Sequence, residues 1–311
     1  MDIRNKVVLV TGGAGTIGCN LAVALLDQDC KVIVVDDLSS GQRGNVPTKA
    51  TFIEGSIMDD NILEKAFSHE PKIIFHLAAN FANKNSVDHP EKDLLVNGIG
   101  TLKVLEWAQK NEIYRFVYSS SSCVYGNKEI SKEDDLDFSS NTPYAITKLL
   151  GEKYVTYFHE MFGMKTIIVR YFNCYGPGEM PGDYRSVIPN FIKLAMEGKQ
   201  LLITGTGEES RDFTYVSDVV AATILVVEKD ETVSGIFNIG TGKETKILEL
   251  AKVVNKIVGN KAGIELKEKR IWDKVSQRRA DIEKIKKVGY EPNVGLEEGI
   301  KKTYQWLKMR L

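Results

Sequence analysis

Residues Val7–Gly18 read VVLVTGGAGTIG, and this stretch decides the fold. An apolar run of the kind that forms a buried strand passes directly into a glycine-rich turn. Glycines allow a tight turn and a close approach of the backbone to a ligand, and the free amides at the start of the following helix attract a diphosphate. Two patterns overlap here: GxGxxG beginning at Gly13, and the looser GxxGxxG beginning at Gly12. Either predicts dinucleotide binding, although an ordinary glycine-rich turn has the same letters.

An acidic pair ends the second apolar run. Asp36 and Asp37 follow Lys31–Val35, roughly 20 residues beyond the glycines. A carboxylate at this strand end can accept hydrogen bonds from both hydroxyls of an adenosine ribose, and it repels a 2′-phosphate. The combination predicts NAD(H) rather than NADP(H) as the cofactor. The alternative is that Asp36 is a solvated strand end with no ligand.

Strand-like and helix-like segments alternate along the first half of the chain. Strands are expected at Thr51–Glu54, Ile73–Leu77, Phe116–Ser119 and Thr166–Arg170, and long helices at Leu94–Gln109 and Tyr144–Met161. The alternation predicts the α/β class, with a doubly wound parallel sheet of the Rossmann type. We expect an NAD-binding domain in residues 1–170, to which segments from about 212–240 return, and a smaller α/β substrate lobe in residues 171–311.

The composition excludes several classes of protein. A formal net charge of −1 gives no overall field for nucleic acid or an anionic membrane surface, and we expect neither partner. No apolar run approaches the roughly 18 residues of a membrane span, and the first residues lack the apolar stretch of a signal peptide. The four cysteines and four histidines show no metal-ligand spacing. We therefore expect a cytoplasmic protein with reduced thiols and no metal site.

The segment Asn141–Lys148 reads NTPYAITK and contains the candidate catalytic pair. Asn141 or Thr142 can cap a helix that begins with proline. Tyr144 and Lys148 then lie one turn apart on the same face. A free tyrosine has a pKa of about 10, so we expect the ammonium, together with a positive nicotinamide, to lower that pKa toward neutrality. A surface Tyr–Lys pair on an amphipathic helix is the alternative.

A run of hydroxyl residues, Ser119–Ser122, ends the strand that precedes this helix. Doubly wound sheets bind their ligands at the carboxyl ends of the strands. One serine of the run can therefore hydrogen-bond a reacting oxygen and relay its proton to Tyr144. A polar loop without a role in catalysis would have the same sequence.

Together these features resemble the extended short-chain dehydrogenase/reductase superfamily and, within it, the nucleotide-sugar epimerases and dehydratases. The resemblance extends over nearly the whole chain. Its ordered motifs are TGGAGTIG (Thr11–Gly18), VDDLSSG (Val35–Gly41), HLAA (His76–Ala79), SSSSCVYG (Ser119–Gly126), YAITK (Tyr144–Lys148), RYFNCYGPGE (Arg170–Glu179), RDFTYVSD (Arg211–Asp218) and FNIGTG (Phe237–Gly242).

The resemblance implies a role for each matching position. Within the serine run it selects Ser121 as the catalytic hydroxyl, beside Tyr144 and Lys148. It implies that these two residues also contact the cofactor, together with Gly12, Gly15, Thr16, Ile17, Asp36, Asp37, Leu38, Ser39, Gly41, Ser56, Ile57, Leu77, Ala78, Ala79, Asn97 and Phe172. It implies substrate contacts from Ser121, Asn173, Val187, Arg211, Arg270 and Asp273, with the two arginines on a diphosphate and the aspartate near the nucleotide ribose.

Two positions depart from the family pattern. Ser56 stands where an aspartate usually binds the adenine amine, which weakens that contact. Cys123 stands where related 4,6-dehydratases and glucuronate decarboxylases have a glutamate, and the lack of this acid/base argues against both chemistries. A cysteine here is similar to GDP-fucose synthase, but that family also uses a histidine in the loop corresponding to Gly178–Arg185, which has none. We expect Cys123 to be a packing thiol at the edge of the site.

The resemblance therefore implies an NAD-dependent nucleotide-sugar 4-epimerase of the UDP-glucose/UDP-galactose type, which acts through a transient 4-keto sugar. A 4-ketosugar reductase would use the same residues but would consume NAD(P)H. A non-enzymatic dinucleotide sensor on this fold would need neither Tyr144 nor Lys148. Family analogy also implies a homodimer, with the helices at Leu94–Gln109 and Tyr144–Met161 in a four-helix bundle. The nucleotide and the sugar remain open at this point.

Overall fold

A parallel sheet forms the centre of the protein, in a computed structural model that describes residues 1–135 and 142–311. Its strand order is β12-β7-β5-β4-β1-β2-β3, and every pairing is parallel. The strands are β1 (Val7–Thr11), β2 (Lys31–Asp36), β3 (Thr51–Glu54), β4 (Ile73–His76), β5 (Arg115–Ser121), β7 (Thr166–Tyr171) and β12 (Ile236–Ile239). Their apolar runs are nearly continuous because both faces of the sheet are covered. The predicted doubly wound sheet is confirmed.

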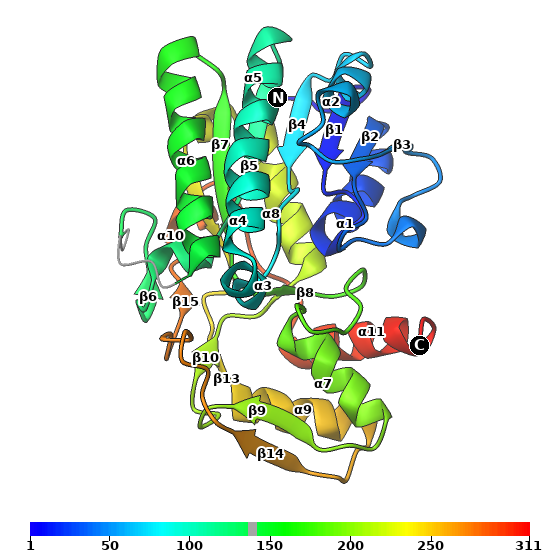
Figure 1. Cartoon of the computed structure of the whole chain (residues 1–311), viewed down its shortest axis with the longest axis vertical. Coiled ribbons are helices and arrows are strands. Elements are labelled where there is room, and N and C mark those ends of the chain that lie inside the picture. The colour runs from blue at the N-terminus through cyan, green and yellow to red at the C-terminus, as the bar shows by residue number, and fades with distance from the viewer. Residues whose placement is uncertain (136–141) are drawn as a thin grey trace.

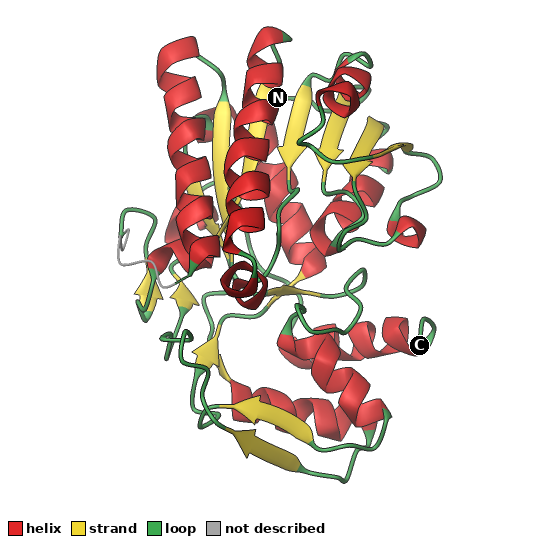
Figure 2. Cartoon of the chain, viewed as in Figure 1, coloured by secondary structure: helices red, strands yellow, loops and turns green. Residues whose placement is uncertain are grey.

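Helices pack on both faces of this sheet (Figures 1 and 2). One face is covered by α1 (Thr16–Leu26) and α8 (Val216–Glu228), and the other by α2 (Asp60–Phe67), α5 (Thr101–Lys110) and α6 (Pro143–Phe162). Successive strand residues point to opposite faces. Val8 and Val10 therefore pack in the core beneath α1, whereas Leu9 packs in the core beneath α5 and α6.

The stretch Leu94–Gln109 is helical, as the sequence predicts, but its first part is not a regular α-helix. The chain forms α3 (Asn83–Asp88) and α4 (Pro90–Asp93), and then a π-helical segment, Leu94–Gly100, leads into α5. Two glycines lie in this π-helical segment, where helix propensity is low. Widened helical turns of this kind are frequent at functional sites.

A smaller lobe lies beyond the carboxyl ends of the strands (Figure 1). Its helices α7 (Val187–Met196), α9 (Ile247–Val258) and α11 (Leu296–Lys308) pack on one another, and α7 and α9 also contact the parallel pair β9 (Leu201–Thr204) and β14 (Ile264–Lys267). The remaining short elements are β6 (Ile130–Ser131) with β15 (Arg279–Ala280), β8 (Cys174–Tyr175) with β11 (Thr214–Tyr215), β10 (Ser210–Arg211) with β13 (Thr245–Lys246), and α10 (Glu283–Lys286).

The chain crosses between the sheet and the smaller lobe more than once. After β7 it enters the smaller lobe, and it returns through β11 and α8, which packs against α1. Strand β12 then pairs with β7 at the edge of the sheet before the chain leaves again. Among the described residues, no helix is long and apolar enough to cross a membrane.

Candidate active site

A cavity of about 970 Å³ lies between the carboxyl ends of the strands and the smaller lobe. Parallel sheets place loop residues together at this edge, so segments far apart in the sequence meet here. Most of the predicted site residues line the cavity: Gly12, Gly15, Thr16, Ile17, Asp36, Asp37, Ser39, Ser56, Ile57, Leu77, Ala78, Ala79, Ser121, Tyr144, Lys148, Asn173, Val187, Arg211, Arg270 and Asp273. The fold thus brings the cofactor, catalytic and substrate motifs to one space.

The glycine turn provides a close-fitting wall at one end. Gly12 has a positive φ of 71°, and a Cβ on it would lie 2.6 Å from the amide nitrogen of Ala78. A Cβ on Gly18 would lie 2.3 Å from the carbonyl oxygen of Gly12. Helix α1 begins after Gly15 with no side chain capping its amides. These uncapped amides at the cavity wall fit the diphosphate of a dinucleotide.

Asp36 connects the glycine turn to the loop that follows β2. Its Oδ2 accepts from the amide of Ala14 at 2.9 Å, and its Oδ1 accepts from the amide of Leu38 at 2.8 Å. Burial raises the pKa of this carboxyl, while the two amide hydrogen bonds lower it. A carboxylate oxygen has more than one lone pair, so Asp36 can accept from ribose hydroxyls as well.

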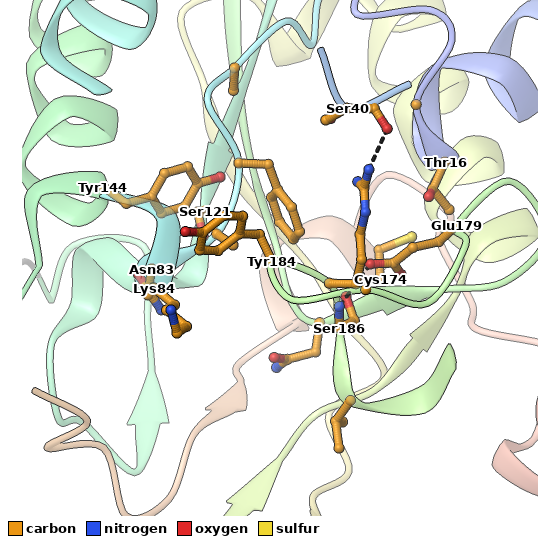
Figure 3. A pocket seen from close by; sticks show the side chains of 18 of the residues that line it. Thr16, Ser40, Asn83, Lys84, Ser121, Tyr144, Cys174, Glu179, Tyr184 and Ser186 are labelled. Atoms are coloured by element: carbon orange, nitrogen blue, oxygen red, sulfur yellow. Dashed lines mark hydrogen bonds between the residues drawn. The ribbon is translucent and has the colours of Figure 1, made fainter. Parts of the chain in front are cut away.

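Tyr144 and Ser121 lie beside one another in the cavity (Figure 3). Thr142 caps α6 by accepting from the amide of Ala145 at 3.3 Å, which fixes where the helix begins. Asn141, the other predicted cap, lies outside the described residues. Ser121 ends β5, and its Oγ accepts from the amide of Cys123 at 3.2 Å. A strand end and a helix start therefore hold the two hydroxyls together.

Lys148 lies below this pair and is almost fully buried. Its ammonium donates to the main-chain oxygen of Ser119 at 2.8 Å and lies 5.7 Å from the centroid of the Tyr144 ring. Burial lowers the pKa of the ammonium to about 8, against the attraction of Asp93 and Glu152. Lys148 is thus a cation next to the phenol that loses its proton more readily than an exposed lysine.

The polypeptide by itself does not lower the pKa of Tyr144, and the fall expected with a positive nicotinamide stays a prediction. Burial raises the pKa of the phenol well above its ordinary value, and the nearby Cys123 and Asp93 add to that rise. Hydrogen bonding to Ser121 acts in the opposite direction. Desolvation outweighs the ammonium because Lys148 is itself buried and is directed at Ser119.

Four predicted cofactor residues do not line the cavity: Leu38, Gly41, Asn97 and Phe172. Asn97 is buried in the π-helical segment, where its Oδ1 accepts from the amide of Asn80 at 2.8 Å and its Nδ2 donates to Asp93 at 2.9 Å. Asn80 lines the cavity, and Asn97 supports it through this hydrogen bond without lining the cavity itself. Phe172 is fully buried in the core.

A buried ion pair supports the catalytic strand and helix from below. Arg170 on β7 donates to both oxygens of Glu152 on α6, at 2.8 and 2.7 Å, and neither side chain is appreciably exposed. Ser120 on β5 also hydrogen-bonds Glu152. Two strands are thereby connected to the helix that carries Tyr144 and Lys148.

The substrate end of the cavity contains the predicted basic residues. Arg211 donates to the carbonyl of Val275 at 3.2 Å and lies 3.5 Å from Asp273. Arg270 is exposed at the rim, 5.5 Å from the centroid of the Trp272 ring. A cationic wall of this kind can hold the diphosphate of a substrate.

Several lining residues were not predicted. Tyr184 donates to Asp88 at 3.1 Å, and the neighbouring Arg185 donates to the carbonyl of Ser40, which is the dashed line in Figure 3. These two side chains reach opposite sides of the cavity mouth. Arg278 lines the cavity beside Cys123, which therefore faces the site rather than merely packing near it. A positional pattern could have suggested none of them, because their roles depend on how the smaller lobe folds back.

The described residues contain no cluster of three or more His, Cys, Asp or Glu side chains that could hold a metal ion. The donor groups of the cavity include amides, hydroxyls, ammonium and guanidinium groups, which bind phosphates and sugar hydroxyls.

Comparison with known proteins identifies the family. The NAD dependent epimerase/dehydratase family matches residues 8–240. An epimerase structure from Methanothermobacter thermautotrophicus is 45% identical, with a TM-score of 0.97 over 99% of this chain and 94% of that one. The UDP-glucose 4-epimerase structure from Thermotoga maritima, solved with UDP-glucose, is 37% identical, with a TM-score of 0.92 over 97% of this chain and 99% of that one.

A relative with a different reaction also matches. The UDP-N-acetyl-alpha-D-glucosaminuronate decarboxylase of Bacillus cytotoxicus is 34% identical over 97% of this chain and 98% of its own length. The glycine turn, Asp36 and the uncapped start of α1 fit the cofactor that the family requires. The chain belongs to the NAD dependent epimerase/dehydratase family and is an NAD-dependent enzyme of that family.

Proposed function

We propose that this enzyme is a nucleotide-sugar 4-epimerase of the UDP-glucose/UDP-galactose type. The observation that carries the proposal is the meeting of Tyr144 and Ser121 at the junction of the cofactor and substrate ends of one cavity, with a thiol at Cys123. Dehydration and decarboxylation in this family use a carboxylate at that position. Cys123 provides no carboxylate for the proton transfer at C5 on which those two reactions depend.

Each residue has a defined task in this proposal. The phenol oxygen of Tyr144 takes and returns the proton of the sugar 4-hydroxyl, and Ser121 hydrogen-bonds the same oxygen. NAD, when bound, accepts a hydride from C4 and gives it back. Lys148 orients the nicotinamide ribose and stabilises negative charge on Tyr144. The 4-keto sugar turns over between the two transfers, so hydride returns to its opposite face.

The substrate must stay bound while its sugar turns. Asn173, Arg211 and Arg270 line the half of the cavity beyond Ser121, and we assign the diphosphate to them. Binding through the diphosphate keeps the ketone in the site while the sugar ring stays free to turn. The cofactor contacts proposed for Gly12, Gly15, Asp36 and their neighbours lie at the other end of the same cavity.

The purified protein tests the proposal when it is incubated with UDP-glucose or UDP-galactose without added NADH. We expect each sugar to be converted to the same equilibrium mixture, with deuterium placed at C4 retained on C4. Tyr144→Phe should abolish conversion while bound NAD remains. A 4-ketosugar reductase would instead need stoichiometric NADH and a keto substrate, and conversion that depends on added NADH would contradict the proposal.

We further propose a homodimer through the π-helical segment and α6. Large apolar side chains are exposed along these elements: Leu94, Leu95, Ile99, Ile146, Tyr157, Met161 and Phe162. Several large apolar side chains exposed on neighbouring elements are typical of a protein interface. The free cysteines Cys19, Cys30, Cys123 and Cys174 support a reducing, cytoplasmic location. A domain boundary near residue 170 also remains our proposal.

A further inference from the structure

Arg278 is a buried cation in the wall of the active-site cavity. It lies directly before β15 and is only 5% exposed, yet it lines the cavity together with Cys123 and Asn83. The proposed function gives it no role. Burying a guanidinium is costly unless its charge and its N–H groups have partners.

Most of its N–H groups lack a strong acceptor. Nη2 donates to the main-chain oxygen of Gly126, and Nη1 points at the sulfur of Cys123, 3.7 Å away. Sulfur is a weak acceptor. The Nε atom is buried and has no hydrogen-bond partner among the residues that the structure describes. Within residues 1–135 and 142–311, one of its five N–H groups is therefore paired with an oxygen.

The charge of Arg278 is also uncompensated within the described chain. The other deeply buried arginines have carboxylate partners: Arg115 pairs with Asp230 and Arg170 pairs with Glu152, each at 2.7 Å. In residues 1–135 and 142–311, no carboxylate lies within 4.0 Å of Arg278. Burial lowers the pKa of Arg211, and the positive charge of Arg278 lowers it further.

Arg278 is connected through Cys123 to Ser121, where we place C4, the reacting carbon of the sugar. Its guanidinium contacts Cys123, whose amide donates to the Oγ of Ser121 at 3.2 Å. Asn83 approaches the same sulfur at 3.5 Å, and Thr142 fixes its amide by donating to its Oδ1 at 2.9 Å. The cation is thus connected through Cys123 to Ser121, which we place on the sugar 4-hydroxyl, whereas Arg211 is paired with Asp273.

We propose that Arg278 binds a carboxylate carried on the sugar carbon next to C4, so that the preferred substrate is a nucleotide-activated hexuronate. The inference rests on the proposed 4-epimerase reaction, which places C4 at Ser121 and Tyr144. A uronate carries its carboxylate on C5, adjacent to C4. A carboxylate pairs with a guanidinium in a bidentate arrangement, which would use the N–H groups of Nη1 and Nη2 that have no oxygen acceptor among the described residues.

Cys123 is part of this inference. Its sulfur lies 3.7 Å from Nη1 and carries no carboxylate that could compensate the charge of the guanidinium. The uncharged thiol therefore leaves the cation available to an anionic group of the substrate.

The substrate diphosphate is the other anion that Arg278 could bind, and binding measurements separate the two. Tyr144→Phe protein is titrated calorimetrically with UDP, UDP-glucose and UDP-glucuronic acid, so that no turnover occurs. We expect UDP-glucuronic acid to bind at least about tenfold more tightly than UDP-glucose. Adding Arg278→Gln should remove that advantage while the affinities for UDP and UDP-glucose change by less than about threefold. Arg279→Gln, a change in the next residue outside the cavity, is the matched control.

Two results would overturn the inference. One is an equal loss of affinity for all three ligands in Arg278→Gln, which assigns the residue to the diphosphate. The other is the absence of a preference for UDP-glucuronic acid, or of any binding by the three probes, in the parent protein. Bound NAD and thermal unfolding check that the variant is folded. If it is not, the ratio of kcat/KM for UDP-glucuronic acid to that for UDP-glucose in unmodified enzyme decides instead, and a ratio below one contradicts the inference.

These outcomes are distinct from failure of the proposed function. Inversion at C4 of UDP-glucose with no preference for the uronate contradicts this inference and supports the proposed epimerase reaction. A preference that disappears in Arg278→Gln, with no inversion of any sugar at C4, supports the carboxylate site and contradicts the epimerase.

Discussion

The ammonium of Lys148 donates to the main-chain oxygen of Ser119 at 2.8 Å, two residues before the proposed catalytic Ser121. This bond ties the helix carrying Tyr144 to the end of β5. It also fixes the ammonium 5.7 Å from the centroid of the Tyr144 ring. Proton transfer at the phenol therefore depends on an ammonium group whose pKa is lowered by burial.

Turnover should fall as pH rises through the pKa of Lys148. Burial lowers this pKa to about 8, so the ammonium loses its proton and its attraction for a developing phenolate within the ordinary working range. The pH profile of kcat/KM, measured between about pH 6 and pH 10, reports this group in the free enzyme. Lys148→Arg keeps its charge and should show lower activity without the alkaline decline. A wild-type profile that stays flat to about pH 10 would contradict this assignment.

Stability should fall in mild acid because of His76. Its ring lies between the hydroxyls of Thr11 and Thr101, at 2.8 and 3.0 Å, and burial lowers its pKa to about 3. Below its ordinary pKa of about 6.5, the unfolded chain binds a proton that the folded chain refuses. The free energy of unfolding should therefore drop by up to about 1.4 kcal/mol per pH unit as pH falls from about 6.5 toward 3.

Urea unfolding at pH 7 and pH 5 measures this loss for wild type and His76→Gln. The glutamine variant should be less stable at pH 7 but should lose less on acidification. An equal loss in both proteins would assign the acid sensitivity to other groups.

Replacing Asp36 with asparagine should weaken NAD binding and reduce discrimination against NADP. The amides of Ala14 and Leu38 each need a carboxylate oxygen, and an asparagine provides only one. Leaving one amide unpaired costs about 1–3 kcal/mol of stability. Calorimetric titration with both cofactors checks the affinities. Glu54→Gln, at the exposed end of the neighbouring strand and paired in register with Asp36, should leave both unchanged. Unaltered NAD affinity in Asp36→Asn would remove this residue from the ribose site.

Placing a charge on the proposed dimer face should produce a monomer. Ile99 is 42% exposed on the π-helical segment, and an unpaired lysine at that position would be desolvated in a dimer. Light scattering measures the mass of wild type and Ile99→Lys. The control is Leu266→Lys, at a side chain that is 55% exposed on β14 in the smaller lobe. A wild-type monomer would contradict the proposed dimer, and an Ile99→Lys dimer would place its interface elsewhere.

Breaking the buried Arg170–Glu152 pair should destabilise the protein strongly. Glu152→Gln leaves the fully buried guanidinium of Arg170 without its anion and should cost about 3–5 kcal/mol. Glu298→Gln removes the exposed pair with Lys302 and should cost less than about 1 kcal/mol. Urea unfolding compares the two variants. Similar costs for both would mean that solvent reaches Arg170.

The central sheet was predictable because its strands are apolar runs with no other interpretation. Strands such as Thr51–Glu54 match their predicted bounds, and the alternation with helices determines parallel pairing. Helix α11 was not predicted, since its buried side chains form a narrow stripe between charged residues. The π-helical turn at Leu94–Gly100 was not predicted either, because its hydrophobic pattern resembles that of an ordinary helix.

The candidate site was predictable where it depends on motifs and not where it depends on packing. The glycine turn, Tyr144 and Ser121 follow from local sequence. The segment QRRAD contains two adjacent arginines, and only the fold shows that Arg278 turns into the cavity. The rise that burial imposes on the pKa of Tyr144 could not be predicted either, because burial is a property of the whole structure.

The late arrival of β12 constrains how the protein is made and how it can be recombined. The ribosome synthesises this strand some 65 residues after β7, the neighbour with which it pairs. Until then the nascent chain exposes an open strand edge, which is a template for aggregation. A transplant of substrate specificity from a relative must therefore not cut the gene at residue 170. It must leave β11, α8 and β12 with the recipient sheet and exchange the segments on either side of them.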